Sequence, residues 1–532
     1  PIYKTKIGRE ITIAPIYENT DSETTFNWTI DGKSICTTST LTFSADEAGR
    51  YFILISATNA RGTTEKEIRI DVFQLDVPTI SIADADKGFK VLQGSELTIT
   101  PIVDSFLETS YSWQINGEDI SNELTCTLPT IELGEYQVRF ATHNEDGDDE
   151  VTFKVEVCSP DQVDFNWTFL QTEYNMSAGR TIRIKPVDVN NALDAVYTWT
   201  VDNEQVQSGE NDTYLFTSEQ QGEHTVKVEM KNSYILATQT LKVNVCPPAG
   251  TYQRKISATS SASMNRVYEY LPAPGQFINE SHTTTTMAEA CTYAEERINQ
   301  TAYVSLGGFG GYIIVGFDHS IVNDGDYNIA ITGNAFDGSS EPGIVWVMQD
   351  ENGDGLPNDT WYELRGSEYG KAETWQDYAV TYHKPSGIQL PTPWTDNHGQ
   401  SGSIDYLGAF HRQDYYYPAW IKEKQYTLRG TRLKERNYDQ SGNGTYWVND
   451  SYEWGYADNF SAIDRLTDDD NYNAGPSDNH FKISHAVTFD GKDANLKYVD
   501  FIKVQVGVNS KSGWLGEIST EVFGIKDFNM LK

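Results

Sequence analysis

Apolar and polar residues alternate in three strand-like segments, each of which ends a repeat in the first half of the chain. These segments are EKEIRIDV (65–72), VTFKVEV (151–157) and TQTLKVNV (238–245). A period of two places every second side chain on the same face of a strand, so each segment is predicted to bury one face. Upstream of each lies a second shared motif, which reads FNWTIDGK (26–33), YSWQINGE (111–118) and YTWTVDNE (197–204). The first half of the chain is therefore a threefold repeat of short strands.

One tryptophan occupies the same position in each repeat. Trp28, Trp113 and Trp199 lie in register, and a glycine turn with a strand precedes each of them. A tryptophan among alternating strands predicts a small β-sandwich in which the indole fills the space between two sheets. The repeats resemble PKD and related immunoglobulin-like domains, in which a tryptophan strand is followed by a G-x-Y strand. This resemblance implies that the repeats act as spacers and take no direct part in the function.

The pattern changes after residue 247, where short strands are separated by long polar loops. Strands are predicted within residues 307–317, 327–336, 343–349, 361–366, 378–383, 485–489 and 499–506. One helix is predicted over 286–299, where Thr286 and Glu289 are spaced as a capping box. Its predicted apolar face consists of Met287, Cys291, Ala294 and Ile298.

The predicted fold is all-β, with three immunoglobulin-like or PKD-like β-sandwiches followed by a large jelly-roll-type β-sandwich domain with long loops and one short helix. The sandwiches are assigned to residues 1–74, 75–158 and 159–247, and the C-terminal ligand-binding domain to residues 248–532. The first repeat has few residues before its glycine turn, so we expect it to be N-terminally trimmed. Because the chain starts at Pro1, a signal peptide or lipid anchor would lie outside it.

The chain is strongly acidic, which narrows the classes of partner. Its formal net charge is −37 and its basic residues do not cluster, so nucleic acid is not an expected partner. We interpret the acidity as solubility on the surface of an exported protein. The five cysteines are too few for a disulfide framework in a chain of this length and are expected to be small buried thiols. No apolar run reaches about 18 residues, so no membrane-spanning helix is predicted.

The segment DENGDGLPNDTWYEL (350–364) has the pattern of a calcium-binding loop between two strands. Calcium takes six to eight oxygen ligands, and Gly355 would permit the tight turn that lets them converge. Trp361 stands where an EF-hand would have glutamate, so a later acid must complete the set. The predicted metal ligands are Asp350, Asn352, Asp354, Leu356 (through its carbonyl oxygen), Asp359 and Glu363. We expect a structural calcium ion that stiffens the hairpin; the alternative is an acidic surface turn without an ion.

Tyrosines and tryptophans crowd two segments of the C-terminal domain, residues 411–426 and 443–459, and PTPWTDNHGQSG (391–402) is another such loop. Aromatic rings in polar loops offer a rigid, amphipathic surface to a ligand. The predicted ligand-binding residues are Trp394, His398, Tyr416, Tyr417, Trp420, Trp447, Tyr452, Trp454 and Tyr456. The alternative is that rings such as those of residues 415–417 alternate across a strand, so that about half of the set packs inward.

No catalytic signature stands out. The G-x-S-x-G, H-E-x-x-H and Walker motifs do not occur, and His480 and His485 are not spaced as zinc ligands on a helix. With 77 acidic residues, the spacing of carboxylates carries no information about a glycosidase pair. We therefore expect a binding protein and not an enzyme.

Four long motifs of the last domain resemble a known family. They are YEYLPAPGQFIN (268–279), GGFGGYIIVGFDHSI (307–321), residues 340–370 from SEPGIVWVMQ to GSEYG, and VDFIKVQVGVNSKSGWLGEISTEVFG (499–524). Together they resemble the C-terminal domain of PKD-bearing cell-surface lipoproteins of gut Bacteroidetes, in the surface vitamin B12-binding (BtuH-type) family. The resemblance covers residues 250–532. It implies a lipid-anchored protein of the outer membrane that captures cobalamin at the cell surface for an outer-membrane transporter.

Cobalamin suits aromatic loops because its apolar corrin edge is fringed with amides, which polar loop residues can bind. It would be a bound ligand and not a catalytic cofactor. The same loops would also stack on sugar rings, so a surface glycan-binding protein is the first alternative. An adhesive or structural surface protein is the second. The chain is expected to be a monomer that meets a membrane only through a lipid anchor.

Overall fold

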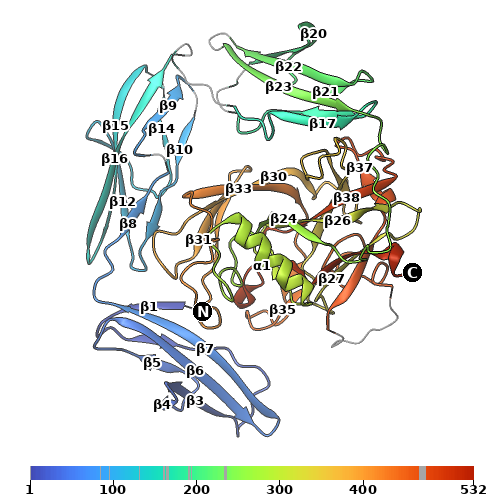
Figure 1. Cartoon of the computed structure of the whole chain (residues 1–532). Helices are drawn as coiled ribbons and strands as arrows, with labels where there is room; N and C mark the ends of the chain where they lie inside the picture. The colour runs from blue at the N-terminus through green and yellow to red at the C-terminus, as the bar shows by residue number, and fades with distance from the viewer. Residues whose placement is uncertain are drawn as a thin grey trace. The chain divides into compact units, whose positions relative to one another are not determined.

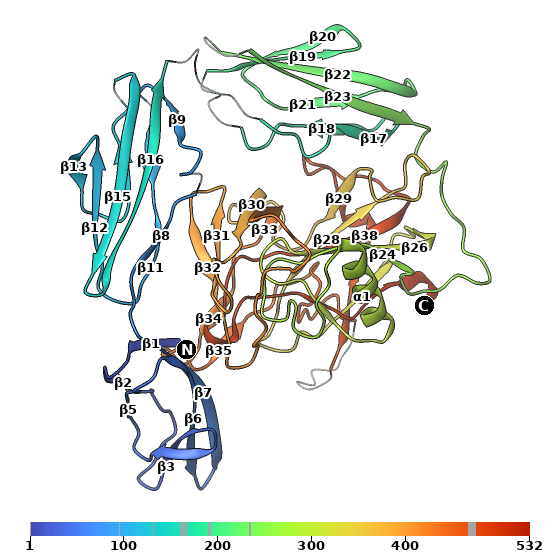
Figure 2. The same cartoon turned by 60° about the vertical axis from the view of Figure 1, so that its left-hand side comes forward.

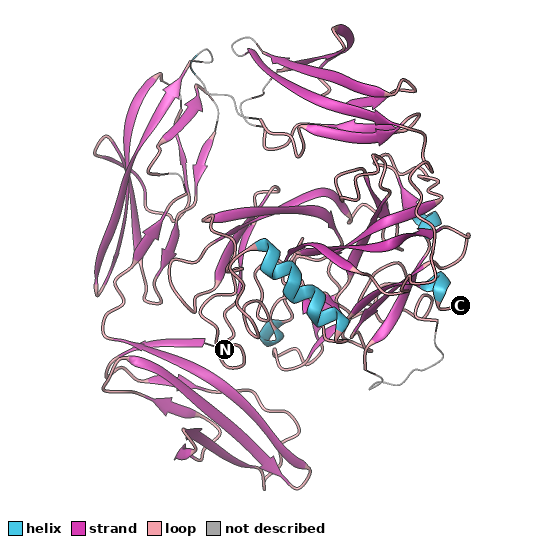
Figure 3. Ribbon diagram, in the orientation of Figure 1, coloured by secondary structure: helices cyan, strands magenta, loops and turns pink. Residues whose placement is uncertain are grey.

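The computed structural model describes residues 2–83, 85–94, 96–130, 132–159, 162, 167–189, 192, 194–232, 236–466 and 475–532. Within these residues almost every element is a strand, and there is one α-helix (Figure 3). The predicted all-β fold class is therefore confirmed. One compact unit comprises residues 1–172, 184–215 and 224–242, and the other comprises 173–183, 216–223 and 243–532. The second unit thus combines three segments of the predicted third repeat, residues 173–183, 216–223 and 243–247, with the C-terminal domain.

The first repeat is a two-layered sandwich (Figure 2). Its strands are β1 (Ile2–Lys6), β2 (Ile11–Ile13), β3 (Thr25–Ile30), β4 (Lys33–Cys36), β5 (Leu41–Phe43), β6 (Gly49–Asn59) and β7 (Gly62–Phe73). One sheet has the order β1-β7-β6-β3-β4, and β2 pairs with β5. β1 runs parallel to β7, whereas β6 and β7 form a long antiparallel hairpin.

The second repeat has the same arrangement with one additional strand pair. Its strands are β8 (Thr79–Ser81), β9 (Phe89–Leu92), β10 (Leu97–Ile99), β11 (Ile102–Asp104), β12 (Ser110–Ile115), β13 (Glu118–Ser121), β14 (Cys126–Leu128), β15 (Gly134–Asn144) and β16 (Gly147–Cys158). The main sheet has the order β13-β12-β15-β16-β9, while β10 pairs with β14 and β8 with β11.

The third repeat again has a five-stranded sheet. Its strands are β17 (Glu173–Ser177), β18 (Thr181–Ile184), β19 (Val196–Val201), β20 (Glu204–Gly209), β21 (Tyr214–Thr217), β22 (Gly222–Lys231) and β23 (Leu236–Cys246). The sheet order is β17-β23-β22-β19-β20, and β18 pairs with β21.

The three repeat tryptophans occupy the cores, as predicted. Trp28, Trp113 and Trp199 have no exposed surface. Nε1 of Trp28 donates to the carbonyl oxygen of Thr38 at 2.8 Å, and Nε1 of Trp113 donates to that of Glu123 at 2.9 Å. Nε1 of Trp199 has no hydrogen-bond partner among the described residues. The indole therefore fills the same space in each repeat, but it is anchored by a hydrogen bond in only the first two.

The C-terminal domain contains the remaining strands, which form several sheets. They are β24 (Arg266–Leu271), β25 (Val304–Ser305), β26 (Tyr312–Val322), β27 (Ile329–Gly333), β28 (Gly343–Met348), β29 (Trp361–Leu364), β30 (Trp375–His383), β31 (Thr392–Asp396), β32 (Ser401–Ile404), β33 (Gln425–Arg432), β34 (Asn437–Asp439), β35 (Trp447–Asn449), β36 (Ser477–Phe481), β37 (Ala486–Val487), β38 (Tyr498–Val506), β39 (Glu521–Val522) and β40 (Gly524–Asp527). The sheet orders are β24-β26-β38-β28-β29-β37, β36-β27-β40, β32-β31-β30-β33, β25-β39 and β34-β35. The described part of this domain also contains three short 3-10 helices: η2 (Ile483–His485), η3 (Gly513–Leu515) and η4 (Phe528–Met530).

The core of this domain lies on one face of the six-stranded sheet. Val345 and Val347 of the central strand β28 share a continuous apolar cluster with Ile329 and Ile331 of β27. The opposite face of β28 is covered by a second cluster, in which Ile344 packs with side chains from the 433–456 segment and from beyond β38. The predicted strands of the domain are all present, and they form a sandwich whose second face is covered by long loops.

The helix α1 (Met287–Asn299) forms where it was predicted and lies against β24 (Figures 1 and 2). The Thr286 hydroxyl accepts from the Glu289 main-chain nitrogen at 3.2 Å, which is one half of a capping box, and the Glu289 carboxylate accepts from the Thr285 main-chain nitrogen at 2.8 Å. The buried face consists of Ala290, Ala294 and Ile298. Met287 and Cys291 of the predicted face are only partly buried. No helix in the described ranges combines the length and apolar character needed to cross a bilayer.

The five cysteines are free thiols. Cys126, Cys158 and Cys246 are buried, as predicted. Cys36 and Cys291 remain partly exposed, so the prediction of burial is wrong for these two.

Candidate functional site

The predicted calcium loop joins β28 to β29, whose strands pair directly so that Met348 lies opposite Trp361. Gly353 and Gly355 adopt left-handed conformations with φ of 77° and 74°. These turns bring two main-chain N–H groups onto the Asp350 carboxylate, at 2.7 Å from Gly353 and 3.0 Å from Gly355. The glycines therefore wrap the loop around Asp350, because other residues rarely adopt this backbone conformation.

Oxygen-bearing side chains of the loop lie next to one another. Asp354 accepts hydrogen bonds from the amides of Asn352 and Asn358, each at 2.8 Å. Asp359 is buried; its Oδ2 accepts from the Glu351 main-chain nitrogen at 2.9 Å, while its Oδ1 has no partner among the described residues. An unpartnered buried carboxylate oxygen is costly unless a cation binds it. The donor set consists of oxygens, which is the chemistry that calcium prefers.

Electrostatics favours neutralisation of these acids. Burial, with the nearby charges of Glu351, Asp350 and Asp354, raises the pKa of Asp359 to about 8. Burial also raises the pKa of Asp350 above its usual range. Burial raises the pKa of Glu351 to about 7, although Arg180 Nε lies 3.1 Å from its carboxylate. The carboxylate oxygens of Asp350, Asp354 and Asp359 do not all lie within 4.8 Å of one another, so an ion would have to draw them together.

Two of the predicted metal ligands, Leu356 and Glu363, differ in where they lie. Glu363 does not belong to this loop, contrary to the sequence prediction. It lies within β29, and its buried carboxylate accepts from the Thr431 hydroxyl of β33 at 2.5 Å. Because the strand has already begun at Trp361, the chain is extended here and directs Glu363 toward the neighbouring sheet. Leu356 remains in the loop, where its N–H donates to Asp354 at 2.7 Å.

The same turn recurs at residues 439–444, between β34 and β35. Gly442 and Gly444 have φ of 70° and 81°, and the main-chain nitrogens of Ser441 and Gly444 donate to Asp439, at 3.0 Å for Ser441 and 2.5 Å for Gly444. The sequences DENGDG and DQSGNG share aspartate at the first position and glycine at the fourth and sixth. This second turn places Tyr446 and Trp447 directly after it. The shared spacing was visible in the sequence, but its significance was missed.

Four of the predicted ligand-binding residues are core residues, so the prediction is wrong for Tyr416, Tyr417, Tyr452 and Tyr456. Each is almost fully buried, and each hydroxyl has a partner in the main chain. The hydroxyls of Tyr416, Tyr417 and Tyr452 donate to the carbonyl oxygens of His411, Glu423 and Lys434, respectively. The Tyr456 hydroxyl accepts from the main-chain nitrogen of Glu368. Tyr416 and Tyr417 are adjacent and both buried, because residues 415–417 are irregular chain and not a strand with alternating faces. A tyrosine whose ring is buried and whose hydroxyl is satisfied has nothing left to offer a ligand.

The other predicted aromatic residues are partly or fully accessible but do not form one site. Trp394 packs against Gly402, and the exposed His398 stacks on Trp375 at 4.3 Å. Trp420 lies 5.9 Å from the Tyr270 ring, and Trp454 lies 5.1 Å from the His485 ring. Among the described residues, no ring contact joins two of these accessible side chains; the one pair within the predicted set, Tyr452 and Tyr456 at 5.3 Å, is buried. The sequence therefore identified loops that carry accessible aromatic rings, but it did not predict that these rings lie apart from one another.

An exposed aromatic patch does form where two turns meet. We define the aromatic patch as Tyr446, Trp447, Trp514 and Leu515. Tyr446 is 53% exposed, Trp514 37% and Leu515 42%. Nε1 of Trp514 donates to the carbonyl oxygen of Thr445 at 3.3 Å, which ties the two turns together.

Trp447 lies between these turns. Its Nε1 donates to the Gly444 carbonyl oxygen at 3.2 Å, and its indole packs so closely on Gly513 that a Cβ there would lie 2.1 Å from Nε1. Polar side chains adjoin the patch. Asn443 lies in the turn that precedes Tyr446, and the Asn437 amide donates to the Lys511 carbonyl oxygen at 2.8 Å. Sequence reasoning missed Trp514, although SKSGWLG places it in a small polar loop of the kind used to select the others.

A separate surface cavity of about 530 Å³ lies along α1. Its lining includes His282, Tyr293, Glu289, Glu296 and Arg297. The rings of His282 and Tyr293 stack at 5.3 Å on its wall. None of the predicted ligand-binding residues lines this cavity.

Comparison with known proteins bears on the first half of the chain. Residues 1–59, 77–144 and 149–232 match the model of a PKD-like domain. The sequence matches no curated protein.

Solved structures that are similar include fibronectin(III)-like modules of Clostridium thermocellum CbhA, at 15% identity over 34% of this chain and 100% of that one, with a TM-score of 0.18. Extracellular domains 3–5 of Drosophila OTK are 13% identical over 46% of this chain and 94% of theirs, with a TM-score of 0.18. The three N-terminal domains of the bacteriophage RB49 Hoc protein are 16% identical over 45% and 94%, also with a TM-score of 0.18. Scores this low carry no argument about this chain. The match to the PKD-like model, together with the three sandwiches, shows that the chain contains PKD-like, immunoglobulin-like domains, a class typical of extracellular, surface or adhesive proteins and usually non-catalytic.

Proposed function

We propose that this protein captures vitamin B12 at the cell surface for an outer-membrane uptake system. In this proposal the C-terminal domain binds the ligand, and the three PKD-like domains hold it away from a lipid-anchored end. The exposed aromatic patch carries the proposal, because Trp514 and Leu515 lie in the motif 499–524 on which the family resemblance rests. A transporter would receive the ligand from the protein, which would act as a monomer.

The patch has the chemistry that a corrin ring requires. Tyr446, Trp514 and Leu515 present apolar surface, and the side-chain amide of the partly buried Asn443 lies in the neighbouring turn. Aromatic rings bury large areas with little loss of conformational freedom, while amides at the edge would pair with the amide side chains of cobalamin. Binding of this kind needs no chemistry at the cobalt.

The loop 350–359 would hold a structural calcium ion in this proposal. Asp350, Asn352, Asp354 and Asp359 would supply side-chain oxygens, and Leu356 its carbonyl oxygen. A divalent charge would stabilise the ionised carboxylates that burial otherwise disfavours. The ion would stiffen the β28–β29 hairpin and would take no direct part in ligand capture.

A glycan-binding function is the second candidate, and the exposure of Tyr446 and Trp514 favours it. Sugar rings stack on accessible aromatic faces, and the polar groups around the patch would bind hydroxyls as well as amides. A purely adhesive role, in which the chain binds neither ligand, is the remaining alternative.

The proposal is tested by mixing the full chain with cyanocobalamin and separating the mixture by gel filtration. Corrin absorbance that elutes with the protein, together with saturable heat in a calorimetric titration, is the expected result. Retention on immobilised polysaccharides without corrin binding would favour the glycan function. If the chain binds neither, the capture proposal fails and the adhesive alternative remains.

A further inference from the structure

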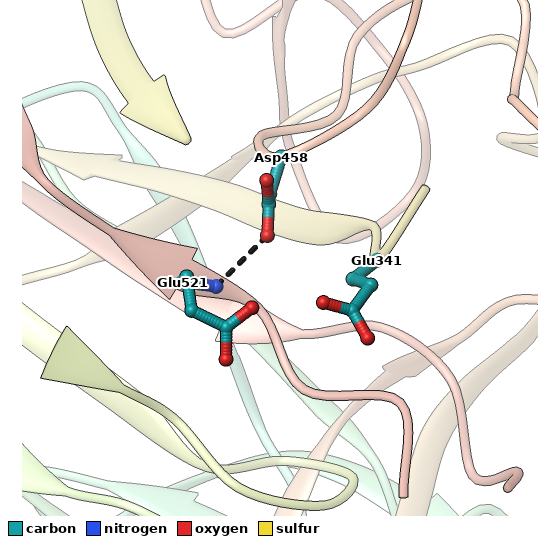
Figure 4. Close-up of side chains that lie close together, drawn as sticks. All are labelled: Glu341, Asp458 and Glu521. Atoms are coloured by element: carbon teal, nitrogen blue, oxygen red, sulfur yellow. Dashed lines mark hydrogen bonds between the residues drawn. The ribbon is translucent and has the colours of Figure 1, made fainter. Parts of the chain in front are cut away.

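Three carboxylates from distant parts of the chain meet inside the C-terminal domain (Figure 4). Glu341 precedes β28, Asp458 follows β35 along the chain, and Glu521 begins β39. One carboxylate oxygen from each lies within 4.8 Å of the other two. Asp458 and Glu521 are almost completely buried, and Glu341 is partly buried. We call this set the acidic triad.

The main chain holds Asp458 in place. Its Oδ1 accepts from the nitrogens of Asn334 and Ala335, each at 2.8 Å, and its Oδ2 accepts from the nitrogen of Glu521 at 2.9 Å. Asp458 itself has a φ of 52°, and a Cβ on Gly333 would lie 2.5 Å from its Oδ1. Close packing and three N–H donors therefore fix the direction of this carboxylate before any ligand arrives.

The Glu341 backbone is tied to the same place. Its main-chain nitrogen donates to the Asp458 carbonyl oxygen, and its own carbonyl oxygen accepts from the Thr520 hydroxyl, each at 2.9 Å. Glu341 thus connects its own segment both to the segment of Asp458 and to that of Thr520, and Glu521 follows Thr520 directly. Hydrogen bonds to the main chain therefore hold the three segments together at the triad.

Glu521 provides the observation that points to a ligand. Its Oε1 is buried and has no hydrogen-bond partner among the described residues. Figure 4 shows the Glu521 and Glu341 carboxylates facing each other. Both can only accept hydrogen bonds when ionised, so the ionised pair is stable only if a shared proton or a cation lies between the two carboxyl groups. No ion pair between described residues involves any member of the triad.

Burial raises the pKa of all three acids, and the charge of Glu341 raises the pKa of Asp458 and Glu521 further. Two neutralising agents are compatible with this electrostatics. Protons can be shared between the carboxyl groups, or a cation can bind all three.

We propose that the acidic triad Glu341, Asp458 and Glu521 binds a calcium ion that ties three segments of the C-terminal domain together. Three carboxylates without nitrogen or sulfur donors suit a hard divalent cation. Calcium suits the site better than magnesium, because magnesium keeps several of its waters and the burial of Asp458 and Glu521 leaves little access for them. The site is distinct from the loop 350–359 and shares no residue with it.

The test counts calcium in variants of the full chain that lack the loop site. The parent for this experiment carries Asp350→Asn and Asp359→Asn. The parent is stripped with EDTA and then dialysed to equilibrium against calcium near pH 7.5, in the presence of excess magnesium. The parent is expected to bind one equivalent of calcium more than the same protein with Glu341→Gln and Glu521→Gln. Glu363→Gln is the matched control, because this buried glutamate lies away from the triad and its loss should leave the calcium count unchanged.

A single substitution guards against misfolding of the double variant. Glu341 is the most accessible member, and Glu341→Gln alone should weaken calcium binding at least tenfold while the circular dichroism spectrum stays that of the parent. The parent should also melt at a lower temperature in EDTA than in calcium. Equal calcium counts in the parent and the triad variants, or a parent whose melting ignores EDTA, would show that the triad shares protons and would overturn the proposal. Occupancy by magnesium alone would also overturn it. Neither result depends on whether the protein binds cobalamin.

Discussion

Trp514→Ala is the substitution that tests the aromatic patch most directly. Trp514 is 37% exposed, so its indole is held on the protein yet presents a substantial face to solvent. The hydrogen bond from its Nε1 to the Thr445 carbonyl oxygen is long at 3.3 Å and lies at the surface. Loss of the indole should therefore disturb the fold little while removing the flattest part of the proposed binding surface.

The exposed area sets the size of the expected effect. A tryptophan side chain can bury up to about 250 Å², so 37% exposure corresponds to roughly 90 Å² available to a ligand. At about 25 cal/mol per Å², complete coverage of this area would contribute about 2 kcal/mol. Because 1.4 kcal/mol is a factor of ten in affinity, Kd should rise by up to roughly 30-fold. Incomplete coverage by the ligand would reduce this value.

The assay is a calorimetric titration of cyanocobalamin into the wild-type protein and each variant, with circular dichroism to establish that the fold is intact. Phe489→Ala is the matched control, because Phe489 is 38% exposed in the same domain but lies outside the patch. The control should bind as the wild type does. Tyr446→Ala, on the other turn, should weaken binding in the same direction as Trp514→Ala.

The reasoning is refuted by one clear pattern of results. If cobalamin binds to the wild type, and Trp514→Ala and Tyr446→Ala bind it with unchanged Kd, the patch is not the binding site. The cavity along α1, with His282 and Tyr293 on its wall, would then be the next surface to probe.

Three further predictions concern stability. EDTA should lower the melting temperature of the C-terminal domain and leave the transitions of the PKD-like repeats unchanged. A calorimetric scan in which EDTA shifts no transition would refute calcium binding at both proposed sites. Burial raises the pKa of Glu363 from 4.5 to about 7, so between these pH values the folded state keeps a proton that the unfolded state releases, and the wild type loses stability as pH rises. In urea unfolding, the stability of Glu363→Gln relative to the wild type should therefore increase by up to about 3 kcal/mol between pH 4.5 and 7. A stability difference that stays constant over this pH range would contradict the burial argument. Trp113→Phe should destabilise its repeat by about 1 kcal/mol more than Trp199→Phe does, because only Trp113 loses a hydrogen bond; equal shifts in the two calorimetric transitions would refute this.

Local patterns in the sequence predicted the elements well. The register of Trp28, Trp113 and Trp199 and the capping box at Thr286 depend on residues close together in the chain, and the structure confirms both. Burial of loop aromatics was harder to predict, because it depends on what the fold brings over each loop. Tyr416 and Tyr452 lie in polar segments, yet both are enclosed by packing from elsewhere.

Charged residues illustrate the same limit. Glu363 follows the calcium-loop pattern in sequence, but the start of β29 directs it toward Thr431. The members of the acidic triad are more than 60 residues apart along the chain and follow no spacing rule, so only the fold could bring them together. The overall acidity was interpreted as a property of the surface, whereas a part of it is buried in this domain.

The two proposed cation sites flank one central strand and have a consequence for the patch. Glu341 lies just before β28 and Asp350 just after it, so calcium at both sites would fix both ends of this strand. The acidic triad also joins the segment that carries Trp447, which ends at Asp458, to the segment that carries Trp514, which ends at Glu521. If both proposals hold, chelation should weaken cobalamin binding although no ion contacts the ligand, and Glu341→Gln should reproduce that loss while leaving Trp514 in place. Cobalamin affinity that is the same in EDTA and in calcium would show that the patch keeps its shape without the ion, and hydrogen bonds such as that between Trp514 and Thr445 would then suffice to hold it.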